Sequence, residues 1–481
     1  MKIDLTEIVW DPKIYPREKW NTKTIETYVD ALKAGDIFPP VVLQTVTNIL
    51  LDGKHRVEAH KKYAEIYEIR KNEKDTEIDR ISEWAIPQAE IDVDFHDVPS
   101  EIPLKLYAAS LSVKHGDRIK PSERKKIARE IFEANPDFKI DVLSTYIGVS
   151  KSSAGGYVSD IRARRTEERK MTAYRLHRLG WTQEEIAENI GTSQNNFSKD
   201  FLHKFPELEK NVKNILDSGI PHLDVAERFN MPLILVHAID LAARTDEQRL
   251  NRLKINIQPY DVWNFSKCDD LFGDQHPGRI PGQLIAHVLY FFTKPGDIIF
   301  DPMSGSGTTQ DVSLAMGRKC YAFDIDPRHE RHDIILHNIG EDGWHDRIKK
   351  ADLLFWDPPY FEKMDKSNIG KDGYVDESIS GYSREKYLDF FTKSLLEAKK
   401  TMKKGAKLAF LMSDWDDETH ERRGIFIWDY ADIIRKAGWN LIRQIQTPLS
   451  TQQVHPDIVN KFRKSRRLAR LERYLLIAEV K

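Results

Sequence analysis

Short, almost entirely apolar runs recur through residues 256–481, and helical stretches separate most of them. The runs read DIIFD, KCYAFDID, DIILHNI, ADLLFWD, KLAFLMSD and RYLLIAEV. Runs of this kind are typical of strands that are buried on both faces, and strands that alternate with helices form mostly parallel sheets. Residues 256–481 are therefore expected to form an α/β domain in which helices cover both faces of a mostly parallel sheet.

A glycine-rich turn follows the first of these runs. The run ends at Asp301, Gly305 and Gly307 follow, and a helix is expected to open near Thr308. Glycine lets the backbone approach a ligand closely, and the first turn of a helix offers free N–H groups. The next run ends at Asp324, and a carboxylate at that position of a Rossmann-like fold suits two ribose hydroxyls. An ordinary strand-to-helix turn would look the same, so this turn alone is a weak signal.

The segment Asp357, Pro358, Pro359 and Tyr360 comes directly after a later apolar run. Open parallel sheets bind ligands at the carboxyl ends of their strands, so this segment and the glycine-rich turn are expected at the same edge. A nucleobase amine is a poor nucleophile that needs acceptors for its two N–H groups, and the Asp357 carboxylate and the Pro358 carbonyl can supply them. The two prolines stiffen the turn, and Tyr360 can stack on an extruded base.

Together these motifs resemble those of the amino-methyltransferases of DNA, and the resemblance covers residues 256–481. The stretch HPGRIPGQLIAHVLYFF, at 276–292, is similar to the helix that flanks the cofactor in that family. The resemblance implies a Rossmann-like domain that binds S-adenosylmethionine and methylates a flipped base of double-stranded DNA. The catalytic residues it implies are Asp357, Pro358, Pro359 and Tyr360. The cofactor-binding residues it implies are Asp301, Pro302, Met303, Ser304, Gly305, Ser306, Gly307, Thr308, Asp324, His276 and Pro277.

Some alternatives remain open within this resemblance. The Asp-Pro-Pro-Tyr motif occurs in both N6-adenine and N4-cytosine enzymes, and adenine is favoured here. Met303 and Ser304 stand where many relatives have Phe-x, and the cofactor motif precedes the catalytic motif, as a cyclic reordering within one fold explains. Glu341 or Asp342 could contact the adenine ring of the cofactor, or could be solvated loop carboxylates. Methylation of RNA or of a protein amide, and a DNA-binding regulator with an inactive methyltransferase half, are the competing functions.

Residues 116–250 are helix-rich and contain three similar helix-turn-helix units, at 140–161, 174–201 and 215–239. In the second unit, Thr182 and Glu185 form a capping-box pattern, and Ser193 can cap the next helix. The second helix of such a unit can lie in the major groove of DNA, although many such units are only packing modules. The candidate groove residues are Gln194, Asn195, Asn196 and Lys199.

Two further stretches suit nucleic acid. The loop at 361–384 interleaves basic and aromatic side chains beside the catalytic motif, which suits a strand-gripping element as well as a solvated loop. Its candidate residues are Lys363, Lys366, Lys371, Tyr374 and Tyr382. The run KFRKSRRLARLER, at 461–473, is strongly basic, and Arg466 and Arg467 are expected to contact phosphates.

Residues 1–115 predict a strand, a turn, a second strand, a tight Asp-Gly turn and a helix. The sequence DGKHRVEAHKK at this turn resembles the ParB-like nuclease and sulfiredoxin-like domains, which implies a small α+β domain. The resemblance implies binding of a nucleotide or DNA phosphate beside His55 and Arg56. Lys54 stands where the sulfiredoxin type has its cysteine, so cysteine chemistry is not expected. Binding without cleavage is favoured over nuclease activity.

Composition limits the remaining possibilities. The formal net charge of the 481 residues is -2, so a DNA-binding surface must be local. The N-terminus lacks the pattern of a signal peptide and no apolar run is long enough to span a bilayer, so a cytoplasmic protein with two reduced cysteines is expected. No Cys–His cluster with metal-ligand spacing appears. No paired restriction nuclease is recognisable, and the oligomeric state is left open, with a homodimer among the options.

Overall fold

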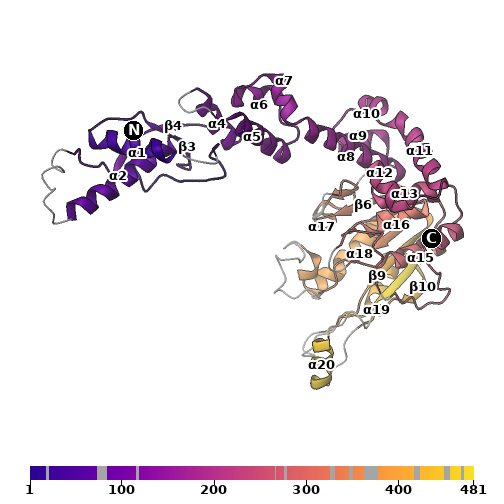
Figure 1. Cartoon of the computed structure of the whole chain (residues 1–481). Helices are drawn as coiled ribbons and strands as arrows, with labels where there is room; N and C mark the ends of the chain where they lie inside the picture. Colours follow the sequence, from indigo (N-terminus) through magenta and orange to yellow (C-terminus); the bar gives the residue numbers. More distant parts are fainter. Residues whose placement is uncertain are drawn as a thin grey trace. The chain divides into compact units, whose positions relative to one another are not determined.

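The chain consists of two compact units. The computed structural model describes residues 1–17, 21–72, 84–114, 119–265, 267–275, 279–325, 331–345, 350–361, 378–415, 423–448, 456–466 and 471–481. The first unit is Met1–Glu168 and the second is Arg169–Lys481 (Figure 1). The boundary between the two units falls within the segment 116–250.

A small mixed sheet forms the centre of the first unit. Its strand order is β1 (Lys2–Asp4), β4 (Glu90–His96), β2 (Val41–Gln44) and β3 (Leu50–Asp52). β2 is parallel to β4, and the other neighbours are antiparallel. The helix α2 (Lys54–Asn72) follows β3 and packs on α1 (Thr22–Lys33). The predicted order of strand, turn, strand, tight turn and helix is thus confirmed.

Helices make up the rest of the first unit. They are α4 (Leu104–Lys114), α5 (Pro121–Ala134), α6 (Ile140–Ile147), α7 (Lys151–Tyr157) and the beginning of α8 (Ser159–Arg178). Gly148 ends α6 in the left-handed conformation at φ +64°, and the Ser150 hydroxyl caps α7. The expected first helix-turn-helix unit therefore forms. Its core contains Leu143 and Ile147 of α6 and Ala154 of α7.

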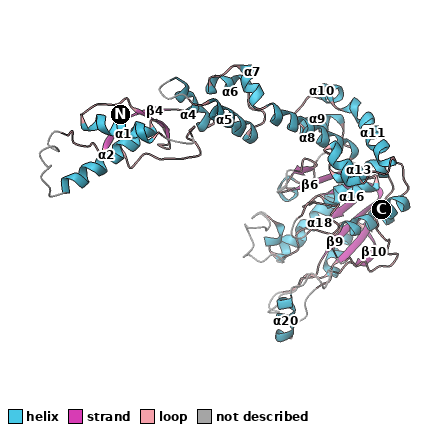
Figure 2. Cartoon of the chain, viewed as in Figure 1, coloured by secondary structure: helices cyan, strands magenta, loops and turns pink. Residues whose placement is uncertain are grey.

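A seven-stranded sheet forms the centre of the second unit (Figure 2). The strand order is β10 (Asn440–Gln446), β11 (Tyr474–Glu479), β9 (Met402–Met412), β8 (Ala351–Trp356), β5 (Ile298–Asp301), β6 (Lys319–Asp324) and β7 (Ile334–Leu336). The pairs from β9 through β7 are all parallel. This confirms a mostly parallel sheet, but β11 runs antiparallel to both of its neighbours, which the apolar runs did not predict.

Helices cover both faces of this sheet. Alternate side chains of each strand point to opposite faces, so each strand contributes to a core on either side. Leu353 and Phe355 of β8 join one core, with side chains of α13 (Leu233–Leu241), α15 (Gly282–Phe292) and α16 (Thr308–Met316). Leu354 and Trp356 join a second core, with side chains of α18 (Arg384–Thr401) and α19 (Ile427–Lys436).

The second and third helix-turn-helix units pack into the first of these cores. Trp181, Phe197 and Val225 are buried in the same cluster as Ala322 of β6 and Leu475 of β11. The helices concerned are the end of α8, α9 (Gln183–Asn189), α10 (Gln194–Asp200), α11 (Phe205–Asp217), α12 (His222–Phe229) and α13. The predicted caps are confirmed: Thr182 and Glu185 form the capping box of α9, and Ser193 caps α10.

The remaining elements of the second unit are short. They are α14 (Asp246–Arg252), α17 (Ile339–Asp342), α20 (Pro456–Ser465) and the 3-10 turns η1 (Leu202–Lys204) and η3 (Ile379–Gly381). Within the described parts of the chain, no helix has the length and apolar character needed to cross a bilayer. Cys268 and Cys320 are both free thiols.

Candidate active site

Adjacent strands bring the two sequence motifs to one edge of the large sheet. β5 and β8 are parallel neighbours, with Phe300 paired to Leu354, so the carboxyl ends of both strands lie at the same edge. Asp301 ends β5, and Asp357 follows β8 directly. The charge of Asp357 also affects the ionisation of Asp301, as expected for neighbouring carboxyl groups. The structure therefore brings the glycine-rich turn and the Asp-Pro-Pro-Tyr segment together, as the sequence predicts.

The glycine loop, residues 301–308, connects β5 to α16. Gly305 and Gly307 have φ angles of +51° and +78°, in the left-handed region that favours glycine. The N–H of Gly305 donates to a carboxylate oxygen of Asp324 at 2.8 Å, across the gap to the end of β6. The loop is thus fixed to the next strand tip, where the sequence predicts a carboxylate for the ribose of a cofactor.

Asp301 is buried at the base of this loop. It accepts hydrogen bonds from the Thr309 hydroxyl at 2.5 Å and from the Met303 N–H at 3.1 Å. Burial raises the pKa of Asp301 to about 7 despite those two hydrogen bonds, and the nearby carboxylates of Asp357 and Asp324 raise it further. Asp324 and Asp357 therefore add negative charge beside Asp301 at this edge, which suits a cationic ligand.

The glycine loop has the properties of a ligand cradle. The hydroxyl oxygen of Ser304 is buried and has no hydrogen-bond partner among the described residues. A Cβ atom added at Gly305 would meet nothing within 4 Å, so the backbone there faces open space. Buried polar atoms normally have partners, so an orphaned hydroxyl beside an open backbone fits a site for a bound cofactor. The first turn of α16 adds N–H groups at the same place.

The catalytic segment, residues 357–360, is held by two tyrosines. The Tyr360 hydroxyl donates to a carboxylate oxygen of Asp357 at 2.8 Å. The Tyr387 hydroxyl, from α18, donates to the carbonyl of Pro359 at 2.9 Å. Tyr387 is fully buried, and burial raises the pKa of its hydroxyl well above the usual value, so it remains a neutral donor. The sequence gave no signal for Tyr387, because it lies 28 residues away on a helix.

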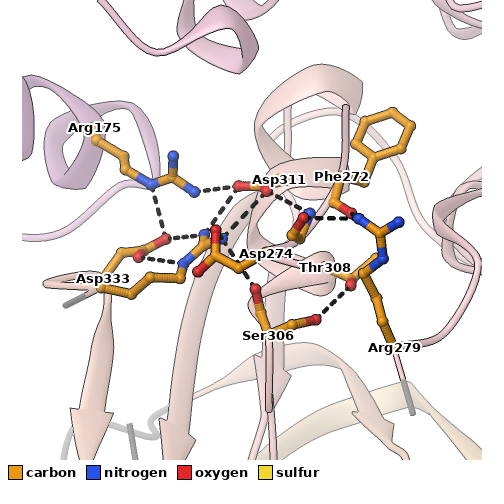
Figure 3. A network of polar contacts seen from close by, with 10 residues as sticks. Arg175, Phe272, Asp274, Arg279, Ser306, Thr308, Asp311 and Asp333 are labelled. Atoms are coloured by element: carbon orange, nitrogen blue, oxygen red, sulfur yellow. Dashed lines mark hydrogen bonds and ion pairs between the residues drawn. The ribbon is translucent and has the colours of Figure 1, made fainter. Parts of the chain in front are cut away.

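A buried network of charged side chains lies behind the glycine loop (Figure 3). Arg331 and Arg175 both bind the carboxylates of Asp311 and Asp333. Arg331 also donates to the carbonyl of Ser306, within the loop, at 3.1 Å. The sequence analysis missed this network, because its members come from α8, α16 and the segment before β7 and no local motif joins them.

Other predicted residues have the following positions. Gln194, Asn195, Asn196 and Lys199 are exposed on α10, as groove contacts require. Glu341 and Asp342 are exposed on α17, where Asp342 accepts from the N–H of Asn338 at 3.3 Å. Arg466 follows α20 with a φ of +53°. The predicted residues outside the described parts of the chain are His276, Pro277, Lys363, Lys366, Lys371, Tyr374 and Arg467.

The phosphate candidates of the first unit are engaged within the fold. The Arg56 guanidinium donates to the carbonyls of Pro39 and Pro40, each at 2.6 Å, and pairs with Asp52 at 2.8 Å. The ring Nε2 of His55 accepts from the N–H of Asn21 at 3.1 Å. Both side chains therefore fix the turn that joins β3 to α2. Because their polar atoms are engaged within the fold, they do not indicate a bound ligand.

The sheet order and the ligand cradle define a Rossmann-like fold of the S-adenosylmethionine-dependent methyltransferase class. Residues 158–335 match the model of the N6/N4 family described as DNA methylase, and this segment contains the whole glycine loop. Over part of its length the chain is thus similar to S-adenosylmethionine-dependent DNA amino-methyltransferases.

Curated relatives include DNA adenine methyltransferase YhdJ of Escherichia coli (strain K12). It is 32% identical over 130 residues, which are 24% of this chain and 42% of that protein. Type II methyltransferase M2.DpnII of Streptococcus pneumoniae is 34% identical over 79 residues, which are 16% of this chain and 30% of that protein. The chain thus spans less than half of the length of these relatives.

Two solved structures are similar to parts of the chain at low identity. A methyltransferase from Pyrococcus furiosus has a TM-score of 0.26 and 15% identity, covering 43% of this chain and 87% of that one. The chromosome-partitioning protein ParB from Caulobacter crescentus, complexed with CTP-gamma-S, has a TM-score of 0.18 and 9% identity, covering 33% of this chain and 75% of that one.

Proposed function

We propose that the protein transfers a methyl group from S-adenosylmethionine to the exocyclic amine of a flipped base in double-stranded DNA, with N6 of adenine favoured over N4 of cytosine. The observation that carries this proposal is the position of the Asp357 carboxylate beside the glycine loop, at the edge shared by β5 and β8. A cytoplasmic location and the place of the enzyme in a restriction-modification system are part of the same proposal.

The glycine loop would hold the cofactor, with Asp324 at the ribose and the orphaned Ser304 hydroxyl and the first turn of α16 as further donors. When bound, S-adenosylmethionine supplies an electrophilic methyl group. The acidic edge around Asp301 suits the positive charge of that cofactor. The work of the chain is then mainly to hold the amine in line with the methyl group.

Asp357 would accept one N–H of the target amine, so that the nitrogen lone pair is released from the ring and can attack. The second acceptor is the carbonyl of Pro358, since Tyr387 binds the neighbouring carbonyl of Pro359. The Tyr360 hydroxyl donates to Asp357, which holds the tyrosine ring close to that carboxylate. An extruded base could stack on that ring.

The sharpest test replaces Asp357. We expect Asp357→Ala to abolish methyl transfer and to leave the dissociation constant for S-adenosylmethionine, measured by calorimetry, nearly unchanged. Asp389→Ala is the matched control, because Asp389 is an exposed aspartate of α18 that pairs with Lys393 in the following turn. Retained turnover in Asp357→Ala would contradict the proposal.

Sequencing with modified-base detection identifies the substrate. DNA from cells that express the wild-type protein is expected to carry N6-methyladenine at a defined sequence, and DNA from cells that express Asp357→Ala is not. N4-methylcytosine at a defined sequence would support the chemistry and correct the base. Unmodified DNA together with cofactor binding would favour the regulator with an inactive methyltransferase half.

Two regions would hold the DNA. The exposed polar residues Gln194, Asn195 and Asn196 of α10, with Lys199, suit base edges and phosphates in the major groove. The basic segment at 461–473, with Arg466 and Arg467, suits the phosphate backbone. The first unit would act as a ParB-like module that recruits the enzyme to DNA. The resemblance of the turn around Arg56 supports that role, and the division into domains at 1–115, 116–250 and 256–481 remains part of the proposal.

A further inference from the structure

The buried charge network behind the glycine loop contains two guanidinium groups and two carboxylates. Arg331 binds Asp311 at 3.0 Å and Asp333 at 2.8 Å, and Arg175 binds the same Asp333 at 2.8 Å and also pairs with Asp311 (Figure 3). The four side chains are at most 14% exposed. The charges balance within the network, and such a group rigidifies its surroundings only while every member is present.

The ionisation of the carboxylates agrees with this balance. Burial alone would raise the pKa of Asp311, but the charges of Arg331 and Arg175 hold that pKa below its usual range. The pKa of Asp333 is lowered in the same way, against burial, by Arg175 and Arg331. Both carboxylates are therefore charged at neutral pH, and each loses a counter-charge if Arg331 or Arg175 is removed.

The network also holds the glycine loop, at the residue that follows the one bound by Asp324. Arg331 donates to the Ser306 carbonyl at 3.1 Å, and the N–H of Asp274 donates to the same carbonyl at 2.9 Å. The guanidinium also lies over Gly307, because a Cβ atom there would be 2.3 Å from its central carbon. The loop between the two positive-φ glycines is thus fixed at one end by Asp324 and at the other by Arg331.

Two more segments are joined through Asp311. Its carboxylate accepts from the N–H of Gly273 at 2.7 Å, which draws the segment before α15 against the loop. Arg279 donates to the carbonyls of Phe272 and Gly273 at 3.1 and 3.0 Å and so orients the same segment (Figure 3). Arg175 comes from α8, the helix that leads into the second helix-turn-helix unit. The network therefore connects the glycine loop to α8, α16, the segment before β7 and residues 272–274.

We infer that Arg331 and Arg175 are positioning residues for cofactor binding: they hold the glycine loop in the conformation that receives S-adenosylmethionine, and Arg175 makes α8 part of that support. The inference rests on the proposed function. Neither arginine touches the reacting atoms in this assignment. Arg331 acts on the loop through the Ser306 carbonyl, and Arg175 acts through the two carboxylates that orient Arg331.

The test compares cofactor affinity among arginine variants of the full chain. We expect Arg331→Gln and Arg175→Gln each to raise the dissociation constant and the KM for S-adenosylmethionine about tenfold, the size of a lost charge-assisted hydrogen bond. At saturating cofactor, kcat should remain within about twofold of wild type, because the acceptors at Asp357 are unchanged. Arg331→Lys should recover part of the affinity, since it restores the charge but not the two-pronged contact.

Arg178→Gln is the matched control. Arg178 lies on the same helix, is 20% exposed, and pairs with Glu209 at 3.1 Å, away from the glycine loop. It should leave the cofactor affinity unchanged even if it lowers thermal stability. An equal loss of affinity in Arg178→Gln and Arg175→Gln would overturn the inference, because docking of α8 in general would then explain both.

A double-mutant cycle separates positioning from general stability. Arg331→Gln and Asp311→Asn should be strongly non-additive in cofactor affinity, since both remove the same support. Additive effects, or wild-type affinity in both arginine variants with only a lower melting temperature, would overturn the inference. Failure of the wild-type protein to bind S-adenosylmethionine in calorimetry would instead overturn the proposed function.

Discussion

Both units of the molecule contain the same local pattern among their described residues: a strand that ends in aspartate, a glycine with positive φ, and a helix. In the first unit Asp52 ends β3, and Gly53 at φ +101° precedes α2. In the second unit Asp301 ends β5, and Gly307 at φ +78° precedes α16. A pattern search on the sequence treats both as candidate phosphate or cofactor turns.

The polar groups of the two turns are used differently. In the first unit, Arg56 satisfies Asp52 and two backbone carbonyls, so the turn is closed on itself. In the second unit, Asp301 is fully buried with only neutral donors, and the Ser304 hydroxyl has no partner among the described residues. The backbone pattern alone therefore does not distinguish a structural turn from a ligand-binding turn. Buried polar groups without partners make that distinction.

The largest effect is expected from the glycines themselves. Gly307→Ala would force a methyl group against Arg331 at a positive φ, and we expect it to weaken S-adenosylmethionine binding by about 100-fold, because the loop must shift. Gly53→Ala would place a methyl group 2.6 Å from a Val41 side chain atom and should destabilise only the first unit. Calorimetry on both variants checks this, and equal loss of cofactor binding would break the comparison.

In the second unit, Asp301 should make the free energy of unfolding depend on pH. A pKa near 7 means that folded Asp301 keeps its proton where the unfolded chain has lost it, so the free energy of unfolding falls as pH rises from about 4 to about 7. Asp301→Asn should remove this fall, which amounts to about 4 kcal/mol because each pKa unit is worth about 1.4 kcal/mol. Urea titrations at several pH values measure the slopes, and an unchanged slope in Asp301→Asn would contradict the assigned pKa.

Arg56 should matter to folding rather than to the cofactor. Arg56→Gln leaves two carbonyls and Asp52 without their donor, and we expect a local loss of about 2 kcal/mol in the first unit. Hydrogen exchange should then speed up in β2 and α2 and remain unchanged in β5 and α16. Lys61→Gln, an exposed change in the same helix, is the control. Unchanged exchange in Arg56→Gln would mean that the turn is held by other contacts.

The smallest effect is expected at Tyr387. Tyr387→Phe removes the donor to the Pro359 carbonyl and should lower kcat about fivefold, equivalent to about 1 kcal/mol, because the catalytic segment is less firmly held. The dissociation constant for S-adenosylmethionine should not change. A weaker cofactor complex with normal kcat would show that Tyr387 supports the glycine loop instead of the catalytic segment.

The sequence predicted those parts of the site that are formed by residues adjacent in the chain. The apolar runs located β5, β6 and β8, and strand adjacency then placed Asp301 and Asp357 at one edge. Local chemistry also predicted the caps at Thr182 and Ser193. In each case the structure depends on interactions between residues a few positions apart, so the local sequence pattern is enough to predict it.

The supports of the site could not be predicted in this way. Arg175 and Asp311 are 136 residues apart, and their pairing depends on how α8 packs on the second unit. The reversal of β11 depends on which neighbours accept the strand, since an apolar run reads the same in both directions. The contact of Tyr387 with the Pro359 carbonyl is likewise long-range, and no motif of α18 predicts it.

The burial of Trp181, Phe197 and Val225 together with Ala322 and Leu475 has a practical consequence for engineering. Helices that share a hydrophobic core with the large sheet cannot be replaced as a block by helices of another protein. The new side chains would leave cavities in that core or overfill it. Under the proposed role of α10 in DNA binding, a change of target preference would have to alter only the outward residues of that helix and keep every inward residue.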